Sequence, residues 1–284
     1  MPNSIRGVLT VLLFTSFIQA TEPARQLTTD GLLKRDPIYI NSGTAILYSV
    51  RAESPRLVLM RLDLQTGKTQ RFHAKSNLVE FRPTISRDGQ RLAFQRMTGN
   101  DVCSLYVEEL STGREQVIAT SKKTSFNAAL SPDGTELVYN LAGQLYRKNI
   151  AADKGATLSH SSGRSDWPAW SPDGDHIAFA SSRKRDYDLF VVDRNGQDVR
   201  QLTDATGFDI RPSWSPDGRR IAFTSNRDRN YEIYLINEDG SNRRRLTKHD
   251  ERDDYPSWHP DGQHLVYVAE RNGRSDLWEL KLEE

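Results

Sequence analysis

The sequence predicts an all-β fold, a six-bladed β-propeller of four-stranded blades, on three observations. A turn motif recurs as SPDG at 131–134, 171–174 and 215–218, as HPDG at 259–262, as SRDG at 86–89 and, more weakly, as NSG at 41–43. The glycines of these motifs are 46, 45, 40, 44 and 44 residues apart, which is the period of propeller blades. No sustained helical pattern follows residue 20.

One complete unit, residues 211–247, contains the four strands in order. "PSWS" is the first strand and "RRIAFTS" the second, and the turn between them places proline where φ is preset and glycine where φ is positive. "EIYLIN" is the third strand and "RRRLT" the fourth. The units keep apolar residues at the same strand positions, and a blade can bury those faces only against its neighbours in a ring.

The last unit contains only three strands before the chain ends. An unpaired edge there would leave the ring open. The missing fourth strand has the form x-R-x-L-T, and "ARQLT" at 24–28 has that form. We therefore expect residues 24–28 to pair with residues 275–282 and to close the last blade, with Leu27 in the structural position of Leu202 and Leu246.

Residues 1–20 have the pattern of a secretory signal peptide, with Arg6 before the apolar run 7–18 and Ala20 at a cleavage site. The alternative for this segment is a buried strand or helix. We expect an exported protein, periplasmic or secreted, whose mature part is residues 21–284. No later segment approaches 18 apolar residues, so no membrane span is expected in the mature protein.

Composition excludes several classes of function. The 284 residues carry a formal net charge of +1, whereas nucleic-acid binding requires a clear excess of basic residues. Cys103 is the single cysteine, so neither an intrachain disulfide nor a cysteine-based zinc site is expected, and a buried apolar role is favoured over that of a nucleophile. We expect a monomer.

The WSPDG-xx-IAF-x-S-x-R units, each followed by an aromatic third strand and then Leu-Thr, resemble the WD40-like repeats of the TolB family. The likeness covers residues 24–284 and is strongest from Trp167 onward. It implies a periplasmic propeller whose face or channel mouth binds another protein, as the TolB propeller binds the peptidoglycan-associated lipoprotein. TolB proper also has an N-terminal α/β domain, which we do not expect here, so a link to the inner-membrane Tol proteins is not implied.

The residues that precede each first strand should gather at one mouth of the channel. They mix carboxylates, arginine and large aromatics, and Trp, Tyr and Arg are enriched at binding hot spots. The alternative is that each aromatic packs on its neighbouring blade and each charge is solvated or bridged. The predicted partner-binding residues are Arg82, Asp166, Trp167, Asp209, Arg211, Asp254 and Tyr255.

Three arginines recur nine residues after the glycine of their turn, which favours a structural role over ligand binding. We expect Arg183, Arg227 and Arg271 to reach Asp166, Asp209 and Asp254, respectively, through charge-assisted hydrogen bonds.

No catalytic motif is present, so no catalytic residue and no cofactor are predicted. The acidic loop 249–254, "HDERDD", suggests Ca²⁺ binding, with a solvated charge cluster as the alternative. His160 and His249 fall in mouth loops, fewer than the three or four ligands of a usual metal site. The leading hypothesis is a non-enzymatic scaffold that binds a protein or peptide; the alternatives are a hydrolase or lyase acting on a glycan or peptide in the channel, and a small-ligand or Ca²⁺-dependent sensor.

Overall fold

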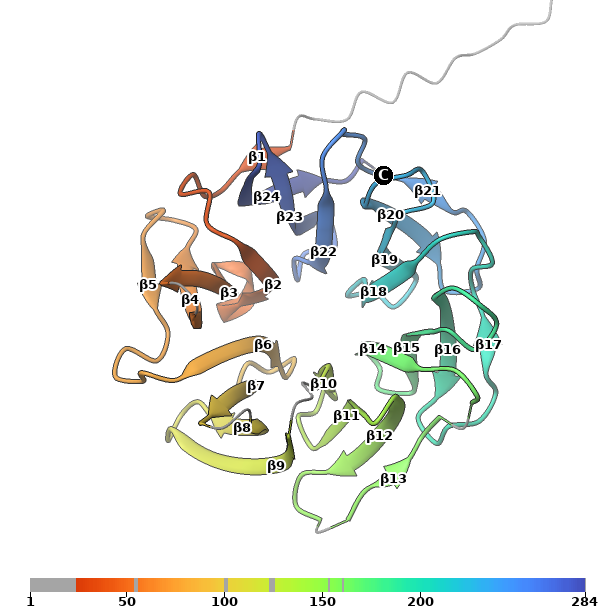
Figure 1. Cartoon of the computed structure of the whole chain (residues 1–284), viewed down its shortest axis with the longest axis horizontal. Coiled ribbons are helices and arrows are strands. Elements are labelled where there is room, and N and C mark those ends of the chain that lie inside the picture. The colour runs from red at the N-terminus through yellow and green to blue at the C-terminus, as the bar shows by residue number, and fades with distance from the viewer. Residues whose placement is uncertain are drawn as a thin grey trace, which may run out of the picture.

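The computed structural model describes residues 24–53, 56–99, 102–122, 126–152, 154–159 and 161–283. The predicted signal peptide, residues 1–20, lies outside the described residues. Six four-stranded antiparallel sheets stand around a central axis in the described part of the chain, as Figure 1 shows. The predicted six-bladed propeller is confirmed.

Each blade runs from its inner strand outward in chain order. Blade 1 contains β2 (Lys34–Ile40), β3 (Ala45–Glu53), β4 (Arg56–Asp63) and β5 (Thr69–Arg71), with a short 3₁₀ turn η1 (Asn41–Gly43) after β2. Blade 2 contains β6 (Val79–Ile85), β7 (Arg91–Thr98), β8 (Val102–Glu109) and β9 (Arg114–Lys122). Blade 3 contains β10 (Ala128–Leu130), β11 (Glu136–Leu141), β12 (Gln144–Asn149) and β13 (Ala156–Thr157).

The second half of the ring repeats this order, and its outer strands are two residues long. Blade 4 contains β14 (Ser165–Trp170), β15 (His176–Ser181), β16 (Asp188–Asp193) and β17 (Arg200–Gln201). Blade 5 contains β18 (Asp209–Trp214), β19 (Arg220–Ser225), β20 (Glu232–Asn237) and β21 (Arg244–Arg245). Blade 6 contains β22 (Asp253–Trp258), β23 (His264–Arg271), β24 (Arg274–Lys281) and, from the other end of the chain, β1 (Arg25–Gln26). Within the described residues, the structure contains no helix with the length and apolar character that crossing a bilayer requires.

The tryptophan before the turn joins blades 4, 5 and 6 each to the preceding blade. The indole N–H groups of Trp170, Trp214 and Trp258 donate to the carbonyls of Ala129, Ala169 and Ser213, at 3.2, 3.1 and 3.0 Å. The rest of the motif closes the turn: in blade 5, Ser215 Oγ donates to Asp217 Oδ1 at 2.5 Å, and Gly218 has a φ of 73°. The repeat is thus a unit of contact between blades as well as a turn.

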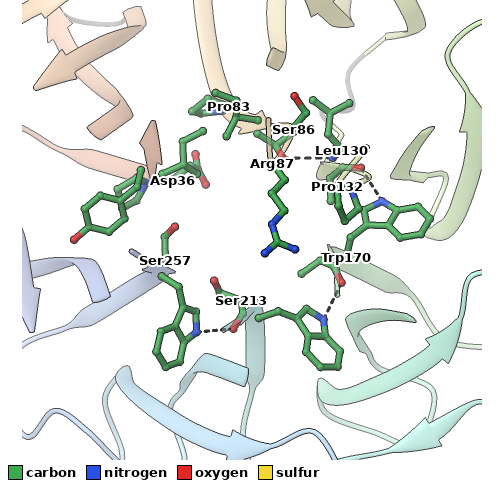
Figure 2. A pocket seen from close by; sticks show the side chains of 18 of the residues that line it. Asp36, Pro83, Ser86, Arg87, Leu130, Pro132, Trp170, Ser213 and Ser257 are labelled. Atoms are coloured by element: carbon green, nitrogen blue, oxygen red, sulfur yellow. Dashed lines mark hydrogen bonds between the residues drawn. The ribbon is translucent and has the colours of Figure 1, made fainter. Parts of the chain in front are cut away.

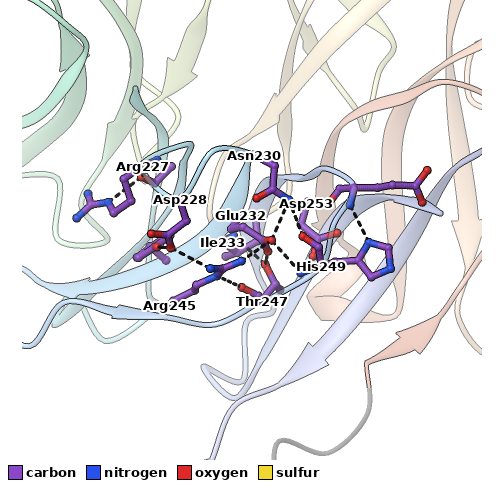
Figure 3. Close-up of polar contacts among 12 residues, drawn as sticks. Arg227, Asp228, Asn230, Glu232, Ile233, Arg245, Thr247, His249 and Asp253 are labelled. Atoms are coloured by element: carbon purple, nitrogen blue, oxygen red, sulfur yellow. Dashed lines mark hydrogen bonds and ion pairs between the residues drawn. The ribbon is translucent and has the colours of Figure 1, made fainter. Parts of the chain in front are cut away.

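The Leu-Thr motif of the fourth strand holds a buried carboxylate at the start of the third strand. In blade 5, shown in Figure 3, Glu232 is fully buried and accepts hydrogen bonds from Arg245 Nη2 (2.7 Å), Thr247 Oγ1 (2.6 Å) and the backbone N–H of His249 (2.8 Å). In blade 4, Gln201 and Thr203 donate to Asp188 in the same way, at 3.2 and 3.4 Å. This contact explains why the sequence repeats R/Q-x-T in the fourth strands of blades 4, 5 and 6, since a buried carboxylate requires partners.

The same contact between a fourth-strand threonine and a buried third-strand carboxylate occurs in blade 6, where it joins the two ends of the chain. Strand β1 pairs with β24, with Arg25 opposite Glu279, which confirms the predicted closure (Figure 1). Thr28 Oγ1 donates to Asp276 Oδ1 at 2.8 Å, so the N-terminal strand satisfies a carboxylate near the C-terminus. Leu27 donates its backbone N–H to Leu277 at 2.8 Å, as Leu202 and Leu246 do to β16 and β20. The fully buried ammonium of Lys34 lies 3.2 Å from Asp276 and so links blade 1 to blade 6. The boundary between these two blades, where the ring closes, is hereafter called the seam.

Candidate functional site

The first strands of the six blades enclose a central channel of about 670 Å³ (Figure 2). Each first strand begins at one end of the channel, hereafter the mouth, and runs to the PDG-type turns at the other end, hereafter the turn end. The wall between the two ends carries small side chains, including Thr84, Ala169, Ser213 and Ser257. The channel is therefore open space bordered by small and hydroxyl-bearing groups, within the volume range of ligand pockets.

Five of the six first strands contain a β-bulge at the mouth. In blade 4, Asp166 pairs with Ala180 and Ala169 with Ala178, so two residues oppose one. The first bulge residue has a positive φ and is followed by proline in every case. These residues, hereafter the bulge ring, are Asp36 (51°), Arg82 (53°), Trp167 (48°), Arg211 (55°) and Tyr255 (58°).

The bulge ring is held at an energetic cost. Non-glycine residues disfavour positive φ, by roughly 1–2 kcal/mol each, and bulky residues there are outliers that cluster at functional sites. Its residues line the channel in each of these blades. Four of the five are predicted partner-binding residues; Asp36 completes the ring, and Asp166, Asp209 and Asp254 lie beside it.

Arg211 links three neighbouring blades at the mouth. Its guanidinium lies over the ring of Tyr255 at 4.2 Å and over that of Trp167 at 5.3 Å, so blades 4, 5 and 6 meet at one side chain. Nη1 is 3.0 Å from Asp254 Oδ1, and Nη2 donates to the Tyr255 hydroxyl at 3.3 Å. Burial lowers the pKa of Arg211, but the combined effect of Asp254, Tyr255 and Asp36 outweighs burial and the pKa is raised. Arg211 is thus a fixed cation.

Asp36 and Arg82 continue the ring on the other side. The backbone N–H of Arg82 donates to Ser49 Oγ at 3.0 Å, and Ser49 Oγ donates to Asp36 Oδ2 at 3.4 Å. Arg82 Nη1 donates to the carbonyl of Phe126 in blade 3 at 3.0 Å. Burial raises the pKa of Asp36, against the lowering effect of Arg82 and Arg211. The contacts among neighbouring blades make the mouth a preformed surface.

The three predicted carboxylates are buried, with exposed fractions of 8% for Asp166, 2% for Asp209 and 1% for Asp254. Asp166 accepts from Asn127 Nδ2 at 2.5 Å, and Asp254 accepts from Thr224 Oγ1 at 2.8 Å as well as from Arg211. Asp166 and Asp254 join adjacent blades, whereas Asp209 pairs with Arg227 of its own blade. Arg82, Trp167, Arg211 and Tyr255 remain partly exposed. Whether these four bind a partner stays a prediction.

Only one of the three predicted arginine–carboxylate pairs has the expected partner. Arg227 lies 2.6 Å from Asp209. Arg271 pairs with Asp253 at 2.7 Å, so the predicted partner Asp254 is wrong by one residue.

Arg183 does not meet Asp166, so that predicted pair is also wrong. It donates to Ser181 Oγ at 3.1 Å and lies over the ring of Phe190 at 4.4 Å. The reason is strand alternation: Ser165, Asp209 and Asp253 occupy the register that faces the arginine, and blade 4 has serine there. Asp166 and Asp254 point to the opposite face.

Loop aromatics that the sequence analysis missed extend the mouth outward. Tyr187, in the β15–β16 loop, meets Trp167 edge-on at 5.3 Å, and Phe208, in the β17–β18 loop, meets Tyr187 at 6.0 Å. Phe208 is 38% exposed. Tyr187 recurs one period later as Tyr231, directly before the third strand of the next blade, and that repetition could have revealed it. Phe208 is signalled only by its aromatic character just before a first strand.

The acidic loop 249–254 uses most of its carboxylates inside the protein. Glu251 accepts from the backbone N–H groups of Asn272 and Gly273, at 2.6 and 2.9 Å, while Asp253 and Asp254 pair with arginines. His249 Nδ1 accepts from the Glu251 N–H at 3.0 Å, and His160 lies outside the described residues. Cys103 is buried, and burial raises the pKa of its thiol to about 11.

Two clusters among the described residues have ligand atoms close enough for a metal ion, and both lie outside the channel lining. One is His259, Asp261 and His264 at the turn of blade 6; the other is His73, Glu108 and Glu115 at the outer face of blades 1 and 2. The described channel lining contains no histidine. The described mouth thus offers hydrogen-bond donors, aromatics and fixed cations rather than convergent metal ligands.

Comparison with known sequences gives one family and partial relatives. A sequence model described as the TolB beta propeller domain matches residues 139–284. An uncharacterized protein of Agrobacterium fabrum is 30% identical over 125 residues, covering 43% of this chain and 42% of that protein. A TolB homolog of Protochlamydia amoebophila is 27% identical over 208 residues, covering 64% of this chain and 43% of that protein. The chain thus spans less than half the length of these two relatives.

Solved structures share the architecture at low identity. A putative TolB from Agrobacterium tumefaciens superposes with a TM-score of 0.71 at 22% identity, covering 91% of this chain and 93% of that one. TolB from Acinetobacter baumannii gives 0.70 at 22% identity, covering 86% and 65%. An oligogalacturonate lyase in complex with manganese gives 0.62 at 18% identity, covering 91% and 80%. At these identities the likeness establishes the fold alone.

Proposed function

Because the chain belongs to the TolB β-propeller family, we propose that it is an exported, periplasmic scaffold that binds a protein or peptide partner at the channel mouth. The bulge ring carries this proposal. Five residues at equivalent positions adopt a disfavoured backbone conformation. If these positions served only to close the ring, residues without backbone strain would be sufficient there.

The composition of the mouth suits protein recognition. Trp167, Arg211 and Tyr255 are the residue types that dominate binding energy at interfaces, and they are central, partly buried and mutually packed. Fixing them before binding lowers the entropic cost of association. Export rests on the signal-peptide pattern of residues 1–20.

Pull-down from an envelope extract tests the proposal with the mature protein as bait. Trp167→Ala and Tyr255→Ala should each reduce the captured partner at least about tenfold, since hot-spot truncations cost 2 kcal/mol or more. Val199→Ser is the control, because Val199 is 48% exposed and does not line the channel. Full capture by both mouth variants, with thermal unfolding unchanged, would contradict the mouth as the binding site.

A further inference from the structure

Arg87 departs from the repeat at the turn end of the channel. The corresponding position in blades 3 to 6 is proline, at 132, 172, 216 and 260. Figure 2 shows the Arg87 side chain extended from blade 2 into the centre of the ring of lining residues. Its Nη1 donates to the carbonyl of Pro172 in blade 4 at 3.1 Å, and its backbone N–H donates to Pro132 in blade 3 at 3.1 Å. The side chain therefore lies across the turn end and obstructs it.

The guanidinium of Arg87 is a cation without a counter-ion among the described residues. The described chain places no carboxylate within 4.0 Å of it, whereas the neighbouring Asp88 is held by Ser86 Oγ and by the backbone N–H of Gln90. An arginine aimed into a channel and bound through only one of its donors retains capacity for an anion.

The other charged groups of the described channel lining balance one another, so its net positive charge comes from Arg87. Among the described lining residues, the ionisable groups are Arg82, Arg87 and Arg211 against Asp36 and Asp88. The Nε–H of Arg211 is buried and has no hydrogen-bond partner. A buried unsatisfied donor is costly unless a ligand or water meets it. The excess positive charge of the described lining therefore lies at Arg87, at the turn end, and the Arg211 Nε–H adds an unsatisfied donor at the mouth.

We propose that the channel captures the free carboxyl terminus of an extended peptide, with Arg87 as the counter-ion of the terminal carboxylate. The inference rests on the proposed binding of a protein or peptide at the mouth and names the part of the partner that enters. A first strand such as β14 has six residues, so mouth and turn end are separated by roughly 20 Å. An acidic side chain on a partner's surface is too short to cover that distance, whereas a chain end can.

The other chain end does not suit the channel. An amino terminus carries positive charge and would meet the guanidinium of Arg87, which has no counter-ion among the described residues, and like charges repel. The small wall residues, with Ser213 and Ser257 in Figure 2, border an open space of about 670 Å³ and offer hydroxyl groups that can pair with the amides of an extended backbone. A carboxyl-terminal segment therefore matches both the charge and the length of the channel.

A peptide library provides the probe. Random heptapeptides displayed with free carboxyl termini are selected on the mature protein, and the enriched sequences are measured by fluorescence anisotropy with free and with amidated termini. Amidation should weaken binding at least about tenfold, the size expected for one charge-assisted contact. Arg87→Gln should cause a similar loss, and Arg87→Lys should restore most of the affinity.

Arg219→Gln is the matched control, since Arg219 lies after the turn of blade 5, is exposed and does not line the channel. Equal binding of free and amidated peptides would overturn the proposal, and so would a selection that enriches no peptide. It would also be overturned if the channel bound an oligouronide through Arg87 and bound no peptide. If amidation and Arg87→Gln have no effect but Trp167→Ala abolishes binding, the mouth remains the site and the carboxylate inference fails. If Trp167→Ala and Tyr255→Ala both leave peptide binding intact, the proposed mouth function itself fails.

Discussion

Arg227 and Arg183 occupy the same position in successive repeats and meet different partners. Arg227 pairs with Asp209, which is only 2% exposed, and also lies over the ring of Tyr234 at 4.9 Å. Arg183 has aromatic contacts of the same kind but no carboxylate in ion-pair range among the described residues. The two arginines therefore separate the effect of a buried ion pair from that of stacking.

Arg227→Ala should lower the free energy of unfolding by about 3 kcal/mol, because removing one partner leaves the other charge buried and uncompensated. Arg183→Ala should cost about 1 kcal/mol, the scale of an exposed or partly buried cation–π contact. Urea unfolding of both variants measures the difference. Equal losses would mean that the Asp209 pair adds nothing to stability.

His73 predicts a pH dependence of stability. Its Nδ1 is 2.7 Å from Glu80, its Nε2 is 2.9 Å from Glu108, and Arg96 also binds Glu80 at 2.8 Å. Burial lowers the pKa of His73, but the hydrogen bonds to Glu108 and Glu80 outweigh this effect and raise it from 6.5 to about 9. The folded state therefore holds a proton that the unfolded chain releases at lower pH.

The stabilisation by His73 should be fully present below pH 6.5 and should disappear as the pH rises through about 9. A raised pKa of this size corresponds to a contribution of about 1–3 kcal/mol. Urea unfolding of the wild type and of His73→Gln at pH 6 and pH 9.5 measures it: the gap between them should shrink at the higher pH. A gap that stays constant or widens would show that His73 is not a protonated bridge.

Aligning the repeats in the sequence identified the recurring arginines and the residues at the mouth, but it did not show to which face of the strand each side chain points. The register that faces Arg227 and Arg271 holds Asp209 and Asp253, and alternation along a strand turns Asp254 to the other face. A one-residue error is therefore enough to assign the wrong partner. Among the described residues Arg183 has no counter-ion because Ser165 stands where the other two blades have aspartate. The sequence contains this serine, but the strand register is needed to know that it faces the arginine.

Strand β1 has only two residues, yet its role in closing blade 6 could be predicted from the sequence. Its two residues would carry no strand signal alone, and it was found because its motif repeats the end of other units. The bulges were not predicted, since one extra residue in a strand is invisible to a pattern of alternation. The signal that could have revealed them is the proline at 37, 83, 168, 212 and 256, which follows every bulge residue.

Deleting residues 24–30 should destabilise blade 6 and leave Asp276 without Thr28. Because strand addition at an open edge restores main-chain hydrogen bonds and side-chain contacts, a synthetic peptide of residues 24–32 should recover stability in a concentration-dependent way. Thermal unfolding at increasing peptide concentration measures this, with a scrambled peptide of the same composition as the control. A deletion variant as stable as the wild type would contradict closure by β1.

At the scale of the whole ring, the seam resembles the other boundaries between blades. Val266, Val268 and Leu277 of blade 6 pack with Tyr39 and Ile46 of blade 1 in a single buried cluster. Comparable clusters span blades 4 and 5 and blades 2 and 3. Because each blade contacts mainly its neighbours, the position of the chain break should matter less than the completeness of the ring.

The two ends of the chain allow this to be tested by circular permutation. The antiparallel pairing of Arg25 with Glu279 places the start of β1 beside the end of β24, and the equivalent strands of blade 5, β20 and β21, are joined by the six residues 238–243. A short Gly-Ser linker from Glu284 to Ala24 should therefore complete blade 6 as a continuous hairpin. New termini between Gln65 and Thr66, in the exposed turn that joins β4 and β5, would make β5 of blade 1 the strand that closes the ring.

We expect this permutant to fold, to unfold within a few degrees of the wild type and to keep the partner captured at the mouth, because neither the bulge ring nor the channel wall includes β1, β5 or the new linker. The control is the linear chain with the same linker appended after Glu284, which keeps the original seam. Near-ultraviolet circular dichroism, thermal unfolding and the envelope pull-down measure the outcome. A permutant that fails to fold while the control is native would show that stability depends on where the chain enters the ring, and that contacts between blades alone do not account for the fold.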